Sequence, residues 1–524
     1  MDERRSRTKG LLFERRGLER AGAILLALAL NVLFLNFPNV EVASSARFDI
    51  QNHDEYRRVP VVMIVFDEFP VASLMNDAGE IDAEHYPNFA RLSDDATWYR
   101  NTSTVGVFTH EALPSILTGK SFEPGTTMTD VHPRNLFTLL GDSYRVRTHE
   151  HLPGFCPANL CRLSRPDPAS GELGPRFNSF ATGERGTNFG SFLDLIEAPQ
   201  EDEKRPFYFG HLVLPHSPWR YLPSGQRYLE ESPEPGEVDI PGPGRAWDRD
   251  GWLTTQVYQR HLLQTGLTDR LVGALIDRLE EAGIYDESLV VVTADHGIAF
   301  QPGHPKRLID AATVGHVAPI PLFIKQPHQR VGRISDRPTE VTDILPTIAD
   351  ILRLSDVWHD LDGTSAFDED ASFNADRRIE GLVLDPMGSE KFEVVQRKYR
   401  LFGTPDGSLD LFSAAPGGVS SILGRPADDV HPYVATDEVV EIDDLPMHVD
   451  ADPRAPMFPA LLEGSVPGTE ERRIVAISVD GVVRAVTRTY LEDGHARFYA
   501  MLDPSDFDSA PNDIDAFVLL RPEA

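Results

Sequence analysis

Two short acidic motifs each follow an apolar run and are suited to binding a cation. Asp67 and Glu68 end one run, and Asp295 followed by His296 ends another. Because the carboxyl ends of parallel strands meet at one edge of an open α/β sheet, we expect these side chains to lie close together. Carboxylate oxygens combined with an imidazole nitrogen suit Mn or Zn better than Ca or Mg. The alternative for either motif alone is an Asp that caps the following helix.

A hydroxyl with nucleophilic potential lies between these motifs. Thr109 begins an apolar segment, residues 109–118, that we expect to be helical. The N-terminus of a helix favours anions, so the oxyanion of a phosphate or sulfate would be stabilised there. A hydroxyl bound to a cation loses its proton more easily and becomes nucleophilic at neutral pH. The simpler alternative is that Thr109 only caps the helix.

The elements that must position these residues alternate between apolar runs and amphipathic stretches. From residue 60 to 352 this alternation predicts an α/β fold with a mainly parallel sheet flanked by helices. In residues 260–282, leucines recur near the helical period and predict a long helix. The clearest predicted strands are residues 60–66, 206–214, 288–293 and 321–325.

The chain changes character after about residue 353. Residues 398–402 are followed by Gly-Thr-Pro-Asp-Gly and are predicted as a strand before a turn. Pro426 to Pro453 holds nine acidic residues and no Lys or Arg, which is typical of a linker or solvated loop. Residues 473–486 predict a hairpin that turns at Asp480-Gly481. We therefore expect a smaller β-containing region at the C-terminal end.

The N-terminal end carries an export or anchoring signal. The whole chain has a formal charge of −32, but its first twenty residues hold seven basic and four acidic side chains. An apolar run follows at residues 21–37, and this order is typical of a segment that enters the membrane with its basic end in the cytoplasm. We predict a retained single-pass anchor with the rest of the chain outside the cytoplasm. A cleaved signal and a secreted protein is the alternative, and a buried core helix is a third.

The net charge indicates which partners to exclude, and the two cysteines indicate a disulfide. The acidic body of the chain would repel nucleic acid, so no nucleic-acid partner is expected. Cys156 and Cys161 are the only cysteines and lie close enough in sequence to close a short disulfide loop. In an exported chain the disulfide is the favoured interpretation, and two unpaired buried thiols are the alternative.

Four motifs together resemble the sulfatase-like branch of the alkaline phosphatase superfamily. The resemblance covers about residues 60–365 and implies an alkaline-phosphatase-like fold. It also implies one divalent metal site made by Asp67, Thr109, Asp295 and His296, with Thr109 as both ligand and nucleophile. The motifs are Tyr86–Leu92 with the following residues 96–101, Thr109–Gly119, Asp295-His296-Gly297 and Thr342–Thr347.

The sequence departs from the sulfatases at Thr109. Sulfatases carry Cys or Ser there, within a C/S-x-P-x-R motif, and oxidise it to formylglycine. A Thr cannot give this aldehyde, so no formylglycine is expected, and Thr is the residue used by the phosphoryl-transferring members. His211 and His216 resemble the H-x-x-x-S-H-x-P motif of the phosphoglycerol and phosphoethanolamine transferases, with Pro215 in place of the Ser. In that resemblance the histidines contact the phosphodiester or a second metal.

Two histidines, His211 and His316, each have two possible roles. His211 falls late in a predicted strand, so a satisfied core histidine is an equal alternative to a substrate contact. His316 precedes a predicted strand at the place where the family has a site residue. We expect His316 to be a further ligand or the acid that protonates the leaving group, because His can do either near pH 7.

These features predict a membrane-anchored, extracytoplasmic, metal-dependent phosphoric ester or diester hydrolase or phosphotransferase. Its substrate would be a phosphorylated or sulfated small molecule, glycan or lipid. The alternatives are a sulfuric ester hydrolase and a catalytically degenerate surface binding protein. The predicted N-terminal parts are a basic cytoplasmic segment (1–20), an anchor or signal (21–37) and a linker (38–59). They are followed by a catalytic domain (60–365) and its C-terminal part (366–425), an acidic linker (426–454) and a β-rich region (455–524).

Overall fold

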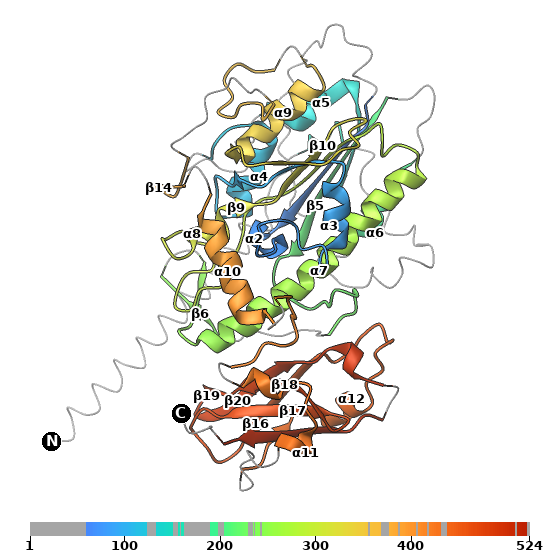
Figure 1. Cartoon of the computed structure of the whole chain (residues 1–524). Coiled ribbons are helices and arrows are strands. Elements are labelled where there is room, and N and C mark those ends of the chain that lie inside the picture. The colour runs from blue at the N-terminus through green and yellow to red at the C-terminus, as the bar shows by residue number, and fades with distance from the viewer. Residues whose placement is uncertain are drawn as a thin grey trace, which may run out of the picture. The chain divides into compact units, whose positions relative to one another are not determined.

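The structure is a computed structural model, shown in Figure 1, that describes most of the chain after residue 58. The predicted basic segment and anchor, residues 1–37, lie outside the described residues, and so does nearly all of the predicted linker. No helix among the described residues is long and apolar enough to span a bilayer. The described residues are 59–122, 133–149, 156–157, 159–161, 189–197, 204–228, 234, 236–241, 244–354, 357–367, 377–385, 388–404, 407–416, 419–430, 438–508 and 511–520.

A mixed, mainly parallel sheet forms the centre of the predicted catalytic domain, as the sequence predicts. Its strand order is β11-β2-β10-β8-β1-β5-β4. The strands β4, β5, β1 and β8 run parallel, whereas β10 is antiparallel to both its neighbours. The bounds are β1 (Val61–Asp67), β2 (Thr97–Tyr99), β4 (Arg145–His149), β5 (Pro206–Pro215), β8 (Leu289–Ala294), β10 (Leu322–Lys325) and β11 (Arg333–Ser335).

Helices cover both faces of this sheet (Figure 1). The ring of Phe209 in β5 contacts Phe137 of α5, with centroids 5.2 Å apart. A Cβ added to the next residue, Gly210, would meet Phe192 of α6 at 3.3 Å. Because neighbouring residues of a strand point to opposite faces, α5 and α6 lie on opposite sides. The helices are α3 (Pro87–Ser93), α4 (Thr109–Thr118), α5 (Leu136–Leu140), α6 (Phe189–Asp194), α7 (Gly251–Glu281), α8 (Val314–Val317), α9 (Ile344–Ile351) and α10 (Glu390–Phe402).

One predicted strand is wrong. Residues 398–402 form the last turns of helix α10. The buried residues of this helix include Lys391, Val395, Lys398 and Phe402, which recur at the helical period. Two members of this buried stripe are lysines. The stripe therefore reads as polar in the sequence, and only the short apolar end of the helix resembled a strand.

Two antiparallel sheets form most of the C-terminal region, with strand orders β15-β16-β20-β19 and β18-β17-β21. The predicted hairpin is confirmed as β17 and β18, and Asp480 and Gly481 in its turn both have positive φ. Part of the predicted acidic linker forms β15 and helix α12 (Leu445–Val449). The strands are β15 (Glu441–Ile442), β16 (Leu461–Val466), β17 (Ile474–Val479), β18 (Val482–Arg488), β19 (Tyr490–Glu492), β20 (His495–Met501) and β21 (Ile514–Leu519).

Helix α7 contacts this C-terminal region through its first turns. Asp250 caps the helix by accepting hydrogen bonds from the backbone N–H groups of Trp252 and Leu253. The same carboxylate pairs with Arg488 of β18 at 2.5 Å and with Arg472 at 3.0 Å. A single buried cluster of apolar residues includes Tyr258 of α7 together with residues of β16, β17 and β20. The β-rich region therefore shares its core with the longest helix of the predicted catalytic domain.

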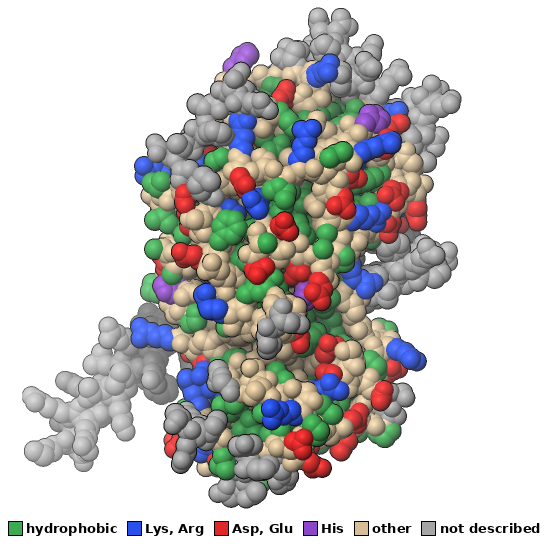
Figure 2. All heavy atoms as spheres, viewed as in Figure 1, with side chains coloured by type: hydrophobic (Ala, Val, Ile, Leu, Met, Phe, Trp, Pro, Cys, Tyr) green, Lys and Arg blue, Asp and Glu red, His purple; other side chains and the backbone are tan. Residues whose placement is uncertain are grey.

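Two smaller features bear on the sequence predictions. Cys156 and Cys161 form a disulfide, as predicted, with their Cα atoms 6.1 Å apart. On the face shown in Figure 2, acidic and basic side chains are interspersed over both regions.

Candidate active site

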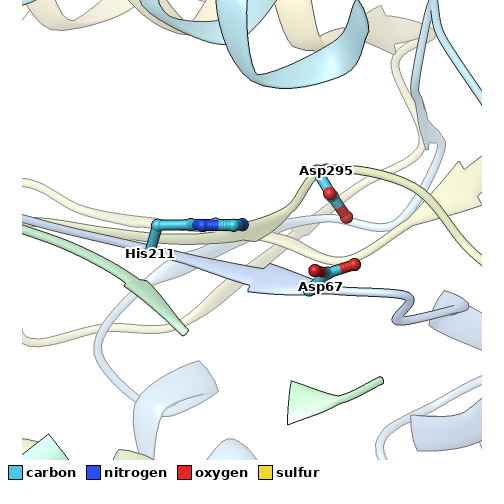
Figure 3. Close-up of side chains that lie close together, drawn as sticks. All are labelled: Asp67, His211 and Asp295. Atoms are coloured by element: carbon cyan, nitrogen blue, oxygen red, sulfur yellow. The ribbon is translucent and has the colours of Figure 1, made fainter. Parts of the chain in front are cut away.

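Three buried side chains converge at the carboxyl edge of the central sheet (Figure 3). Asp67 ends β1, His211 lies in β5, and Asp295 follows β8 directly. One ligand atom from each lies within 4.8 Å of the others. The register explains this convergence, because Val65 of β1 pairs with His211 and Phe66 pairs with Ala294. The sequence prediction that Asp67 and Asp295 meet is confirmed.

The donor set of this cluster fits a divalent cation. Asp67 Oδ1 and Asp295 Oδ2 are buried and have no hydrogen-bond partner within the described part of the chain. Burial, together with the nearby charge of Asp295, raises the pKa of Asp67 to about 6. Two buried carboxylates at this distance repel one another unless a positive charge lies between them. Two carboxylate oxygens and an imidazole nitrogen are a donor set that Mn and Zn accept.

His296 is held beside this cluster by its own backbone. Its N–H donates to Asp295 Oδ1 at 2.6 Å, and its ring Nδ1 donates to the carbonyl of Gly297 at 3.0 Å. The ring Nε2 lies 3.6 Å from Asp295 Oδ2. A Cβ at Gly297 would lie 2.2 Å from the carbonyl oxygen of His316, so only glycine fits this turn. His296 as a metal ligand stays a prediction that this geometry suits.

Thr109 is the first residue of helix α4, as the sequence predicts. Its side chain is partly exposed. Glu111 fastens the chain just before the helix by accepting hydrogen bonds from the N–H groups of Val107 and Phe108 at 2.9 and 3.3 Å. The helix ends at Gly119, whose φ of 68° suits a left-handed C-cap. The roles of Thr109 as nucleophile and ligand stay predictions.

His216 lies just beyond β5 and belongs to a second cluster with Glu68 and Arg307. Its Nε2 atom is 2.6 Å from Arg307 Nη2 and 3.7 Å from Glu68 Oε2. Arg307 Nε also donates to Glu68 Oε1 at 2.5 Å. Burial alone would raise the pKa of Glu68, but the charges of Arg307, His216 and Lys306 together outweigh burial and hold this pKa far below its usual range. Sequence reasoning missed Arg307, for which the only signal is a Lys-Arg pair after the Asp-His-Gly motif.

His316 lies in the short helix α8 and is buried. Burial lowers its pKa to about 3, so its ring is neutral near pH 7. A neutral imidazole serves as a ligand or a proton acceptor, whereas a leaving-group acid requires a protonated ring. His316 is not one of the three side chains that converge in Figure 3, and its catalytic role stays a prediction.

Comparisons with known proteins found one matching family model and several similar solved structures. The family model described as Sulfatase matches residues 60–354. Similar solved structures include a phosphonate monoester hydrolase from Silicibacter pomeroyi, with 18% identity, 59% of this chain and 76% of that chain covered, and a TM-score of 0.39. A lipoteichoic acid synthase from Listeria monocytogenes has 16% identity, the same two coverages and a TM-score of 0.40. The C-terminal periplasmic domain of EcEptC from Escherichia coli has 16% identity, coverages of 57% and 84%, and a TM-score of 0.38. No curated protein matches this sequence.

Proposed function

Because this chain belongs to the sulfatase family, we propose that it is a metal-dependent phosphoric ester or diester hydrolase or phosphotransferase with Thr109 as its nucleophile. The buried cluster of Asp67, His211 and Asp295 is the observation that supports the proposal most strongly. Burying two carboxylates whose oxygens have no hydrogen-bond partner among the described residues costs free energy unless a cation binds them.

The residue type at position 109 favours phosphorus over sulfur. The side chain of Thr109 is a secondary alcohol, so it cannot become the aldehyde on which sulfatases depend. A threonine hydroxyl is instead a competent nucleophile toward a phosphoryl group when its pKa is lowered. Its place at the N-terminus of α4 supports this role, because the backbone N–H groups of a first helical turn stabilise negative charge on phosphoryl oxygens.

Asp67 and Asp295 would hold the cation, with His211 or His296 as nitrogen donors. A bound divalent cation supplies positive charge that lowers the pKa of a nearby hydroxyl and neutralises phosphoryl oxygens. The Thr109 oxygen attacks phosphorus, and a bond from Thr109 to phosphorus forms while the bond to the leaving alcohol breaks. The hydroxyl proton of Thr109 passes to solvent, and the leaving oxygen takes up a proton from solvent. Water or an acceptor hydroxyl then attacks the same phosphorus and loses its proton to solvent, while the bond from phosphorus to Thr109 breaks and the Thr109 oxygen is reprotonated.

The N-terminal segment supports a proposed location at the cell membrane. Residues 21–37 would anchor the chain in the cell membrane and place the catalytic domain outside the cytoplasm. The proposed substrate class is a phosphorylated small molecule, glycan or lipid at that surface.

Parallel assays of a bis-aryl phosphate and an aryl sulfate, with Mn or Zn supplied, test the proposed reaction. We expect the wild type to cleave the phosphodiester and Thr109→Ala to lose at least about 10³-fold of this activity, since the nucleophile is gone. Thr109→Ser keeps a hydroxyl and should keep measurable turnover. Sulfate cleavage that survives Thr109→Ala would instead support a sulfuric ester hydrolase that does not use Thr109.

A further inference from the structure

Aromatic side chains lie on both sides of Thr109 in the chain. Phe108 directly precedes helix α4, and its ring stacks with that of His110, with centroids 5.6 Å apart and an interplanar angle of 19°. The ring of Phe122, which follows the end of the helix, is perpendicular to His110, with centroids 6.2 Å apart. Two of the three rings are thus nearly parallel and the third is perpendicular. We call Phe108, His110 and Phe122 the aromatic corner.

The aromatic corner is accessible to solvent. The side chain of His110 is 54% exposed, and Phe108 and Phe122 are both partly exposed. Folding normally buries phenylalanine rings, because each removes a large apolar area from water. Neighbouring aromatic rings that stay accessible on both sides of a proposed nucleophile are therefore typical of a ligand-binding surface.

The aromatic corner also adjoins the proposed metal site. The guanidinium of Arg307 lies 5.8 Å from the ring centroid of Phe108. The Nε atom of the same guanidinium donates to Glu68 at 2.5 Å, and the backbone N–H of Glu68 donates to Asp295 Oδ1 at 3.3 Å. A phosphoester that reacts at Thr109 must place its organic group next to the residues that flank Thr109.

The rings are held in place before any ligand binds. Glu111 accepts hydrogen bonds from the backbone N–H groups of Val107 and Phe108 through one oxygen, and its other oxygen lies 3.9 Å from His110 Nε2. The ring of Phe108 packs against a buried apolar cluster that includes Val107 and Val314. A surface that is already ordered binds a ligand with a smaller loss of conformational entropy.

We propose that the aromatic corner binds a ring with an apolar face, carried by the organic group of the phosphoester, and so determines which esters react at Thr109. A flat ring can stack on one ring of the corner and meet another at its edge, which are the two geometries that aromatic groups favour. A flexible chain gains neither contact and loses more conformational freedom when it is bound. The inference rests on the proposed function, because it concerns the substrate that reacts at Thr109.

Binding to the full-length Thr109→Ala variant, supplied with Mn, tests this proposal, because that variant lacks the nucleophile and leaves the ligand intact. Titration calorimetry compares four methyl phosphodiesters, whose second alcohol is methanol, n-hexanol, cyclohexanol or phenol. We expect the cyclohexyl or the phenyl ester to bind at least about 10-fold more tightly than the dimethyl and n-hexyl esters, because a ring can stack in the corner. The tighter of the two ring esters tells whether the site takes a saturated or an aromatic ring.

Variants of the corner show whether its rings cause this preference. Adding His110→Ala or Phe122→Ala to Thr109→Ala should reduce the advantage of the ring esters to about 3-fold or less. His110→Phe keeps a ring and should keep the preference. Phe367→Ala is the matched control, because this partly exposed ring contacts Tyr99 of β2, and it should leave all four affinities unchanged.

The possible results separate this inference from the proposed function. Equal affinities for the four esters, or tightest binding of the n-hexyl ester, would overturn the inference and leave the proposed reaction intact. A ring preference that persists in both His110→Ala and Phe122→Ala would overturn it as well. Binding of none of the esters would overturn the inference and the proposed function together. A ring preference in a protein whose wild type turns over no phosphodiester would support the corner as a ring-binding site and contradict the proposed reaction.

Discussion

At the scale of single residues, the proposed metal site contains two carboxylates that are buried side by side. Asp67 and Asp295 each have an oxygen without a hydrogen-bond partner among the described residues. We predict that Asp295→Asn weakens Mn or Zn binding by at least about 100-fold, because the variant removes one charged ligand of the cation. Titration calorimetry measures this change. Asp286→Asn is the control, since that carboxylate pairs with Arg330 at the surface, and equal affinities in the two variants would contradict the site.

His211 allows a second prediction at this scale. The sequence motif suggested a substrate contact, but the side chain lies with the two carboxylates. We therefore predict that His211→Ala lowers metal affinity by about 10- to 100-fold, as loss of one nitrogen ligand should. Unchanged metal affinity with a raised KM would show that His211 contacts the substrate instead. His216→Ala is the comparison, because His216 contacts Arg307.

At the scale of elements, helix α7 carries a histidine that must stay neutral. His261 is completely buried, and its Nε2 lies 3.0 Å from Ser73 Oγ. Its ring packs near Trp219 and Phe300. Burial lowers its pKa to about 3, although the charge of Glu68 acts in the opposite direction. The unfolded chain binds a proton here near pH 6.5 and the folded chain does not, so acid favours unfolding.

We predict that His261→Gln makes the protein less sensitive to acid. Between about pH 7 and about pH 5 the variant should lose about 2 kcal/mol less free energy of unfolding than the wild type, because one proton uptake is removed. Urea unfolding at the two pH values measures this difference. His304→Gln is the control, since His304 pairs with Asp310 in a part-exposed position. Equal losses in His261→Gln and the wild type would show that His261 does not titrate as described.

The sequence predicted several elements well because their signals are local. The apolar runs of β1, β5 and β8 are continuous, and strands buried on both faces have this pattern. Helix α10 was missed because Lys391 and Lys398 are buried in it. The Nζ atom of Lys398 donates to the backbone carbonyls of Ala72, Ser73 and Met75, which is a tertiary arrangement that no local pattern reveals.

The site was predicted in part for the same reason. Asp67 and Asp295 could be placed together because each ends a recognisable strand. The contact of His211 with them depends on the register between β1 and β5, which the sequence does not specify. Arg307 is 239 residues from Glu68 in the chain, so their pairing emerges only when the sheet and its loops are assembled.

At the scale of the whole molecule, the β-rich C-terminal region is part of what holds α7 in place. Asp250 caps this helix and pairs with Arg472 and Arg488. We predict that Asp250→Ala destabilises the protein by about 2 kcal/mol, because it removes a helix cap and leaves two arginines without their partner. Thermal unfolding measures the loss. Asp239→Ala is the control, as that carboxylate is 88% exposed and its pairing with Arg245 should contribute little; equal stability of the two variants would contradict the role of the cap.

The charge of the molecule also has a consequence at this scale. The chain carries a net charge of −32, and because its first twenty residues are net positive, the excess of negative charge lies in the rest of the chain. An acidic body is repelled by anionic lipid and by phosphorylated substrates at long range. Attraction of a phosphorylated substrate would therefore arise locally, from the proposed cation, the guanidinium of Arg307 and the N-terminus of α4.

Mass spectrometry of the protein after brief exposure to a phosphodiester substrate tests whether Thr109 forms a covalent bond to phosphorus. We expect an added phosphoryl-containing group on the peptide that contains Thr109, absent from Thr109→Ala and from metal-free protein. Rapid phosphodiester turnover by Thr109→Ala, or an adduct on a different residue of the wild type, would contradict it.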